Sequence, residues 1–212
     1  MPARLSLLAA CATICVVLVG ACQRAEVGMT ALAPHVAAPT NSAPAPLSTP
    51  TPAPLKLPLV APRIIINKSR RELALYSAGR LVKTYRVALG LSPSDDKERQ
   101  GDRRTPEGEF YVCAKNAQSQ FYLSLGLSYP NAEDAARGLR AGLITQAQHD
   151  RIVRAIRRKR QPPWDTALGG EVMLHGGGTD SDWTWGCIAL ANADIKELFD
   201  NIPNGTTVII EH

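Results

Sequence analysis

Between Arg24 and Pro62 this 212-residue sequence contains no phenylalanine, tyrosine or tryptophan. The segment consists mainly of Ala, Pro, Ser and Thr, so it lacks the side chains that build a packed core. Aromatic and β-branched residues begin to recur from Arg63 onward, between glycine-containing turns. We therefore expect a folded domain over 63–212, long enough to bury its own core. An extended, proline-rich tether over 22–62 precedes it.

Signatures of several other chemistries are also missing. No Gly-x-Ser-x-Gly follows the run His175-Gly176-Gly177-Gly178, which argues against a serine hydrolase. Histidine and cysteine do not recur at the spacing of zinc ligands, so we expect no metal site. The net charge is only +5 and no nucleic-acid-binding motif accompanies it, so we expect no nucleic-acid partner.

The N-terminal segment is typical of an exported protein. Arg4 precedes a short apolar run from Leu5 to Gly20, which predicts a signal peptide over 1–21 rather than a membrane span. The run ends in Val19-Gly20-Ala21-Cys22, which resembles the lipobox of bacterial lipoproteins and predicts a lipid on Cys22; ordinary cleavage after Ala21 is the alternative. Because Gln23 follows instead of the Asp that retains lipoproteins at the inner membrane, we expect a membrane anchor at the outer membrane, facing the periplasm.

Short β-branched or alternating runs predict a mainly β domain. The first three strands form an antiparallel meander, in which Leu81, Tyr85, Val87 and Leu89 share one face. The polar stretch from Leu91 to Arg104 is expected to be a surface loop. The expected strands are 63–67, 72–76, 81–89, 109–114, 171–174, 188–190 and 206–210.

Helices are expected in an insertion over about 131–160 and in one short segment near the C-terminus. Asn131 can cap a helix that runs to about Arg140, and Thr145 with Gln148 forms a capping-box pattern for a second helix. A third, over 194–200, follows Cys187 and has Asn192 as its expected cap.

The second of these helices carries a dense basic block. Two interpretations stay open: a solvated helix face, or a surface attracted to an anionic wall polymer or membrane. The block consists of Arg151, Arg154, Arg157, Arg158, Lys159 and Arg160.

Cysteine usage directs attention to one thiol. Cys11 and Cys15 leave with the signal peptide and Cys22 is lipidated, so only Cys113 and Cys187 remain in the domain. These two could form a disulfide that acts as a redox lock, or one could be a free reactive thiol. We expect Cys113 to be a packed small residue on the strand face opposite Phe110 and Val112.

His175 and Cys187 together suggest nucleophilic catalysis. His175 ends an expected strand and opens into a glycine-rich loop, and Cys187 follows Gly186. A thiol becomes a good nucleophile when a neighbouring imidazole takes its proton. The backbone N–H groups around Gly186 and Cys187 are candidates to stabilise the developing negative charge on an attacked carbonyl.

The segment 63–211 resembles the L,D-transpeptidase catalytic domain, also called the YkuD domain. Residues Phe121 to Asn131 further resemble the branch of that family that includes murein-lipoprotein amidases. The resemblance rests on Gly101-Asp102 with Thr105-Pro106-Glu107-Gly108-Glu109-Phe110, on His175-Gly176, on Thr184-Trp185-Gly186-Cys187-Ile188 and on Asn204-Gly205-Thr206-Thr207-Val208.

This resemblance implies a mainly β fold, a YkuD-like antiparallel β-sandwich or barrel, and a cysteine acyltransferase of peptidoglycan. Cys187 would attack the carbonyl of the third residue of a stem peptide and hold the acyl group as a thioester. His175 would act as base and acid, with its imidazole oriented by the Gly176 carbonyl. Thr184, Trp185 and Gly186 would form the oxyanion and substrate-binding wall. No cofactor is implied.

Three questions stay open at this point. The acceptor of the thioester could be an amine, either on a second stem peptide or on a wall-anchored lipoprotein, or it could be water, as in an amidase. The domain could also be a catalytically silent wall-binding module. The family commonly has arginine two residues after the cysteine, where this chain has Ala189, so the preference for substrate carboxylates is open.

Overall fold

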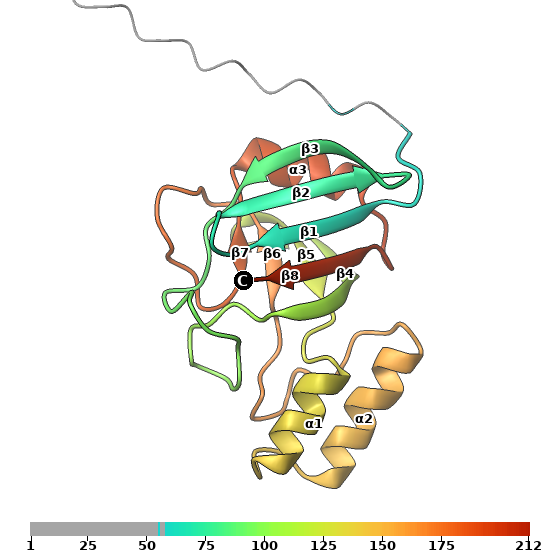
Figure 1. The fold of residues 1–212 in the computed structure, drawn as a ribbon, viewed down its shortest axis with the longest axis vertical. Coiled ribbons are helices and arrows are strands. Elements are labelled where there is room, and N and C mark those ends of the chain that lie inside the picture. The colour runs from blue at the N-terminus through green and yellow to red at the C-terminus, as the bar shows by residue number, and fades with distance from the viewer. Residues whose placement is uncertain (1–54, 56–57) are drawn as a thin grey trace, which may run out of the picture. The chain divides into compact units, whose positions relative to one another are not determined.

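The computed structural model describes Leu55 and residues 58–212, which contain one eight-stranded sheet and three helices (Figure 1). The strand order is β3-β2-β1-β8-β4-β5-β6-β7. The predicted mainly β fold, with a helical insertion and a short helix after Cys187, is confirmed. The strands are β1 Arg63–Asn67, β2 Glu72–Ser77, β3 Arg80–Arg86, β4 Gly108–Ser119, β5 Tyr122–Leu127, β6 Met173–His175, β7 Ile188–Ala189 and β8 Thr207–Glu211; the helices are α1 Ala132–Arg140, α2 Gln146–Arg157 and α3 Asn192–Asn201.

The sheet is mixed, whereas the sequence suggested antiparallel pairing. The meander of β1, β2 and β3 is antiparallel as expected. However, β8 inserts between β1 and β4 and runs parallel to β1, and β6 runs parallel to β7. Parallel neighbours need a crossover connection, and the glycine-rich loop over 176–187 provides it for β6 and β7. This second parallel pair carries His175 and adjoins Cys187.

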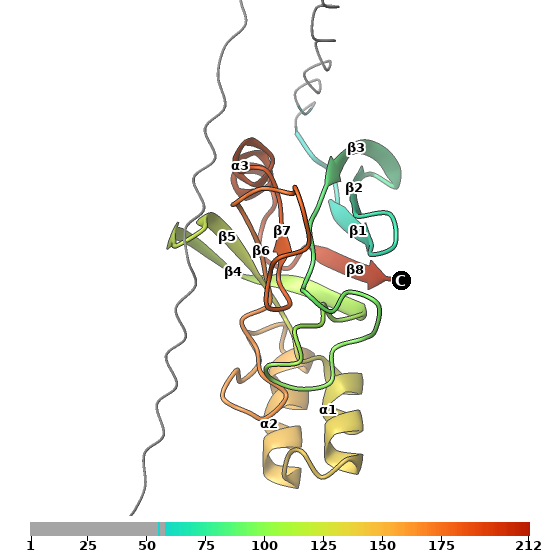
Figure 2. The same cartoon turned by 90° about the vertical axis from the view of Figure 1, so that its left-hand side faces the viewer.

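The core is built from the alternating apolar residues of the central strands. Ile64 and Ile66 of β1 lie opposite Val208 and Ile210 of β8, and all four are at most 1% exposed. Full burial of such a side chain contributes about 1.5–3 kcal/mol. Helix α3 adds Ile195 and Leu198 to the same cluster, and Figure 2 shows α3 at the opposite end of the domain from α1 and α2.

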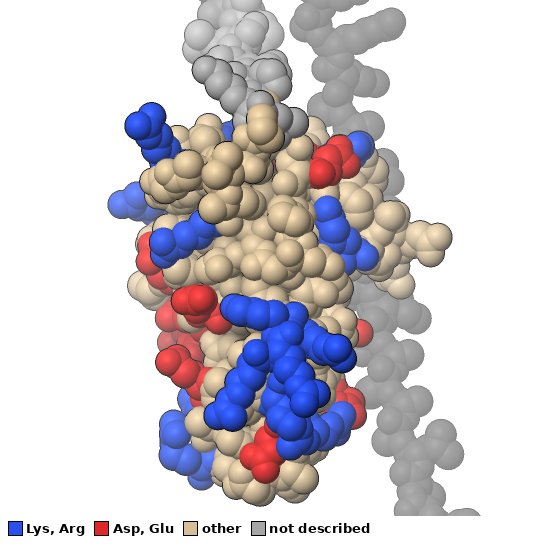
Figure 3. Space-filling model, turned by 90° about the vertical axis from the view of Figure 1, so that its right-hand side faces the viewer, with Lys and Arg blue, Asp and Glu red and all other residues tan. Residues whose placement is uncertain are grey.

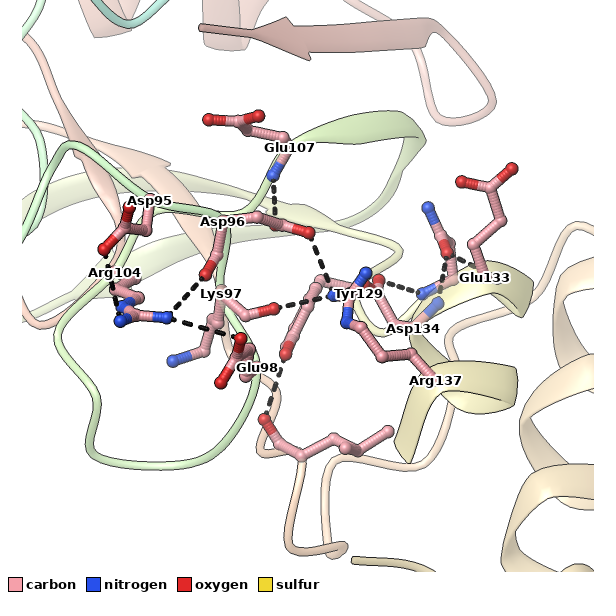
Figure 4. A network of polar contacts seen from close by, with 12 residues as sticks. Asp95, Asp96, Lys97, Glu98, Arg104, Glu107, Tyr129, Glu133, Asp134 and Arg137 are labelled. Carbon is pink, nitrogen blue, oxygen red and sulfur yellow. Dashed lines mark hydrogen bonds and ion pairs between the residues drawn. The ribbon is translucent and has the colours of Figure 1, made fainter. Parts of the chain in front are cut away.

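The two helices of the insertion begin where the sequence predicted. The Asn131 side chain accepts hydrogen bonds from the first turn of α1, and the Asp134 carboxylate accepts one from the Asn131 N–H. Thr145 and Gln148 form the same capping box on α2. Arg137 of α1 then ties the insertion to the rest of the domain (Figure 4), since its guanidinium contacts Asp134 at 2.6 Å and Asp96 at 2.9 Å.

Several local expectations were wrong. Leu81 is 55% exposed although Tyr85 is buried, because Leu81 lies beside the hairpin turn. Strand β5 was not anticipated. Helix α3 begins at Asn192 itself, and its N-cap is Ala191, whose side chain cannot accept a hydrogen bond. The Asn192 side chain instead accepts one from the Gly177 N–H at 3.0 Å.

The expectations for the N-terminal segment concern residues that are not described. The predicted signal peptide over 1–21, the lipid on Cys22 and most of the tether over 22–62 lie outside the described residues. Within the described part, Leu59 packs against the core and the Val60 N–H donates to the Ser77 hydroxyl at 2.8 Å. No helix in that part of the chain is long and apolar enough to cross a membrane.

Candidate active site

The parallel pair β6 and β7 brings His175 and Cys187 to one face of the sheet. Leu174 of β6 pairs with Ile188 of β7, both are fully buried in the core, and His175 pairs with Ala189. Side chains alternate along a strand, so His175 and Cys187, each one residue from these core positions, share the opposite face.

The imidazole of His175 is held in one orientation. Its Nδ1 lies 2.6 Å from the carbonyl oxygen of Gly176. A carbonyl only accepts, so Nδ1 carries the proton and Nε2 keeps its lone pair. The ring stacks on Phe121 with centroids 4.7 Å apart and meets Trp183 edge-on at 5.4 Å. His175 is only 3% exposed, and this burial lowers its pKa, which the Gly176 carbonyl partly offsets. The neutral ring is a base.

The thiol of Cys187 is protonated in the resting site. Its Sγ donates to the carbonyl oxygen of Glu171 at 3.4 Å, and in the described part of the chain no hydrogen bond joins it to the imidazole. Burial raises the pKa of the Cys187 thiol, while the Met173 N–H and the charge of Lys97 act in the opposite direction. Proton transfer to His175 therefore requires the thiol to turn away from Glu171, which is a change of side-chain rotamer.

A tight turn over Thr184–Cys187 fixes the backbone beside the thiol. Gly186 has φ +125°, and a Cβ there would lie 2.7 Å from the carbonyl oxygen of Arg104, so only glycine fits. The Thr184 hydroxyl accepts from the Gly186 N–H at 3.1 Å and donates to the Cys187 carbonyl at 2.7 Å. The Gly186 N–H, expected at the oxyanion, is thus engaged within the turn, and the Cys187 N–H is the remaining candidate donor.

Trp185, the other residue of the expected substrate-binding wall, projects outward from this turn. It is 68% exposed. The guanidinium of Arg103 lies over its ring at 4.8 Å from the centroid. Most of the Trp185 side chain is therefore open to solvent, beside the turn that carries Cys187.

Lys97 is a site residue that the sequence analysis missed. It belongs to the stretch expected to be a surface loop, yet it is only 3% exposed. Its Nζ donates to Asp102 at 2.7 Å and to the Arg99 carbonyl at 3.0 Å, and lies 3.7 Å from the position of a Cβ on Gly186. A buried ammonium therefore lies under the turn that carries Cys187. The signal for it was the Gly101-Asp102 motif, whose carboxylate is its partner.

The loop over 176–187 is anchored by the side chain of Asp182. Asp182 accepts from the Arg71 guanidinium at 2.6 Å and from the Leu89 N–H at 2.9 Å. Asn192 holds the other end of the loop through Gly177. Asp182 therefore fixes the loop to the rest of the domain, and Trp183 packs edge-on against the His175 ring.

The remaining cysteine, Cys113, is a half-buried free thiol. Cys113 and Cys187 are both free, so no disulfide closes the site. Burial raises the pKa of the Cys113 thiol to about 11, which keeps it protonated and unreactive at neutral pH. Among residues 58–212, no three His, Cys, Asp or Glu side chains cluster as metal ligands would.

Comparison with known proteins finds one family over most of the domain. The model of the YkuD family, described as the L,D-transpeptidase catalytic domain, matches residues 61–210. YqjB of Bacillus subtilis, named as a candidate L,D-transpeptidase, is 27% identical over 149 residues, which are 70% of each chain. YafK of Escherichia coli K12, named in the same way, is 29% identical over 146 residues, 64% of this chain and 45% of that protein.

Among solved structures, the helical cell shape determining protein Pgp2 of Campylobacter jejuni aligns with a TM-score of 0.50 and 21% identity. The alignment covers 71% of this chain and 47% of Pgp2. The chain thus spans about half the length of YafK and of Pgp2. At this identity the likeness to Pgp2 shows a shared fold.

Proposed function

This chain belongs to the YkuD family of L,D-transpeptidase catalytic domains, and on that premise we propose that it is a peptidoglycan acyltransferase with Cys187 as nucleophile and His175 as base. The observation that supports the proposal is the pairing of β6 with β7, which sets His175 opposite Ala189, two residues after Cys187. The contact of His175 Nδ1 with the Gly176 carbonyl leaves the Nε2 lone pair free to accept a proton. The substrate is the stem peptide of peptidoglycan.

The reaction needs one proton carrier and one nucleophile. Nε2 of His175 takes the thiol proton as the sulfur attacks the carbonyl carbon of the third stem residue, and the Cys187 N–H donates to the developing oxyanion. The imidazolium then gives its proton to the departing amine of the terminal residue as the C–N bond breaks, leaving a thioester. An acceptor amine loses a proton to His175 and attacks the thioester; the C–S bond breaks, and the departing thiolate takes the proton back from the imidazolium. No metal or cofactor takes part.

The acceptor in this proposal is an amine on a second stem peptide or on a wall-anchored lipoprotein. Water is the alternative acceptor, which would make the enzyme an amidase. The neutral imidazole of the resting site supports both, since it can deprotonate either acceptor in the second step. The mass of the product separates them.

The test incubates the full chain with purified stem tetrapeptide. Mass spectrometry should find an adduct of the chain with the acyl tripeptide, and then a crosslinked product lacking one terminal residue; a free tripeptide alone would indicate water as acceptor. Cys187→Ser should abolish the adduct. The matched control is Cys113→Ser, which removes the other described thiol and should leave turnover unchanged. Binding without any adduct or product would identify a silent wall-binding module and refute the proposal.

We also propose that the chain is exported and held by a lipid on Cys22 at the outer membrane. The sequence before the domain supports this, with its apolar run and the residues Val19-Gly20-Ala21-Cys22. Cys22→Ser should move the protein from the membrane fraction to the soluble periplasmic fraction. A membrane-bound variant would contradict the lipid anchor.

A further inference from the structure

The end of α2 and the segment that follows it surround a hollow lined by arginine. Figure 3 shows the basic side chains gathered on this side of the molecule. The hollow has a volume of about 370 Å³, and Pro162 and Pro163 contribute one wall. Its four arginines are Arg151, Arg154, Arg158 and Arg160.

Within the described part of the chain, few carboxylates lie close enough to pair with these arginines. Of the four, Arg151 alone forms an ion pair there, with Asp165 at 3.4 Å, and that pair is exposed on both sides. The charge of Arg154 helps to lower the pKa of Asp150, one turn earlier in α2, but the two side chains form no ion pair. Exposed pairs of this kind contribute little. By contrast, Arg137 in the neighbouring helix bonds two carboxylates. Cations near the C-terminus of α2 complement the helix dipole, but Arg151 lies before the last turn and Arg160 after it, so the dipole does not account for the whole group.

The wall of the hollow is fixed to the sheet that carries the active site. The Tyr111 hydroxyl of β4 donates to the Arg160 carbonyl at 2.7 Å, and Lys159 lies over the Tyr111 ring at 4.7 Å. The Trp164 ring N–H donates to the Tyr129 carbonyl at 3.0 Å. The same segment continues to Glu171, whose carbonyl accepts from the Cys187 thiol. The hollow and the nucleophile therefore belong to one connected framework.

We propose that this arginine hollow is a second binding site for the wall polymer, which holds a carboxylate of a stem peptide other than the one at Cys187. The planar guanidinium binds carboxylate in a bidentate manner. Peptidoglycan repeats its stem peptides along the chain, so a polymer bound at Cys187 supplies further carboxylates at a high local concentration. The inference rests on the proposed function, because it takes the occupant from the polymer that the active site acts on.

The experiment compares two charge-reversed full-length proteins. Arg154→Glu with Arg158→Glu alters the hollow; Arg63→Glu with Arg80→Glu makes the same change in net charge at exposed positions outside it. Each protein is assayed for co-sedimentation with purified sacculi at increasing salt, and for turnover of soluble stem tetrapeptide. Loss of one hydrogen bond to a charged group weakens binding by about tenfold or more. The hollow variant should therefore bind sacculi about tenfold more weakly, with soluble turnover unchanged in both.

Other outcomes overturn the inference. If both variants bind sacculi equally weakly, the net charge of the protein attracts the wall and the hollow has no special part. If the hollow variant binds sacculi as the wild type does, the hollow is not used. Binding of the wild type to phosphatidylglycerol vesicles, lost in the hollow variant while sacculus binding persists, would assign the site to a membrane. Arg154→Gln with Arg158→Gln repeats the comparison if the reversed variant unfolds. Absence of soluble turnover in the wild type would refute the proposed function, and the sacculus comparison would still test the hollow.

Discussion

Replacing Gly186 by alanine tests whether the turn beside the nucleophile is built as described. A Cβ at this position would lie 2.7 Å from the Arg104 carbonyl oxygen, which is shorter than an ordinary van der Waals contact. That carbonyl cannot easily retreat. The Arg104 N–H is held by Asp102 at 3.1 Å, and the Arg104 side chain pairs with Asp95 at 3.2 Å.

The expected cost has two parts. Holding alanine at φ +125° strains the backbone by about 1–3 kcal/mol, and the collision adds about 1–3 kcal/mol of overpacking. If the turn moves to relieve the collision, Cys187 moves with it, and a displacement of about 1 Å costs about 100-fold in rate.

A matched control separates strain from collision. Gly178 has φ +101°, but a Cβ there would find nothing within 4 Å, so Gly178→Ala should cost only the strain. Urea unfolding should show Gly186→Ala to be about 1–3 kcal/mol less stable than Gly178→Ala, and its turnover of stem tetrapeptide should fall about 100-fold. Equal stability of the two variants, with wild-type turnover for Gly186→Ala, would refute the reasoning.

Three further predictions concern the titration of the two reacting groups. Burial lowers the pKa of His175 from 6.5 and the neutral imidazole is the base, so the acid limb of the pH–rate profile should lie below pH 6.5; a limb above that value contradicts this. Phe121→Ala uncovers the ring, so the pKa of His175 should rise and the acid limb should move upward with it; an unmoved limb would show that Phe121 does not shield the ring. Lys97→Met should raise the pKa of the Cys187 thiol, measured from the pH dependence of alkylation, because a positive charge is removed. Asp102→Asn breaks the same buried ion pair as Lys97→Met, and each variant should lose about 3–5 kcal/mol of stability. Asp102→Asn keeps the Lys97 ammonium, so it should not raise the pKa of the Cys187 thiol. Equal upward shifts of that pKa in both variants would point to loosened packing instead.

The elements of the fold were predictable where their signal is local. The run Arg63–Asn67 is β-branched and forms β1, and the capping residues Asn131 and Thr145 begin α1 and α2 as expected. Strand pairing was harder to predict from the sequence, because apolar residues at every second position predict a strand but do not show which strand pairs with it. The insertion of β8 between β1 and β4 depends on contacts between the two ends of the domain.

The site was predictable to the extent that a motif carries it. The contact of His175 Nδ1 with the Gly176 carbonyl matches the orientation that the resemblance implied, while the roles of His175 and Cys187 in catalysis stay predictions. Lys97 and Phe121 were missed because their roles arise from distant segments of the chain. A lysine in a polar stretch gives no local sign of burial, and the ring of Phe121 meets His175 only through the pairing of β5 with β6.

The central position of β8 also bears on how the molecule is made. Until residues 207–211 are available, β1 and β4 each present an open edge and the sheet remains in two halves. A nascent chain therefore cannot complete its hydrogen-bonded ladder before residues 207–211 have left the ribosome. Any truncation upstream of β8 leaves β1 and β4 each with an uncovered edge, which is a template for pairing with another chain.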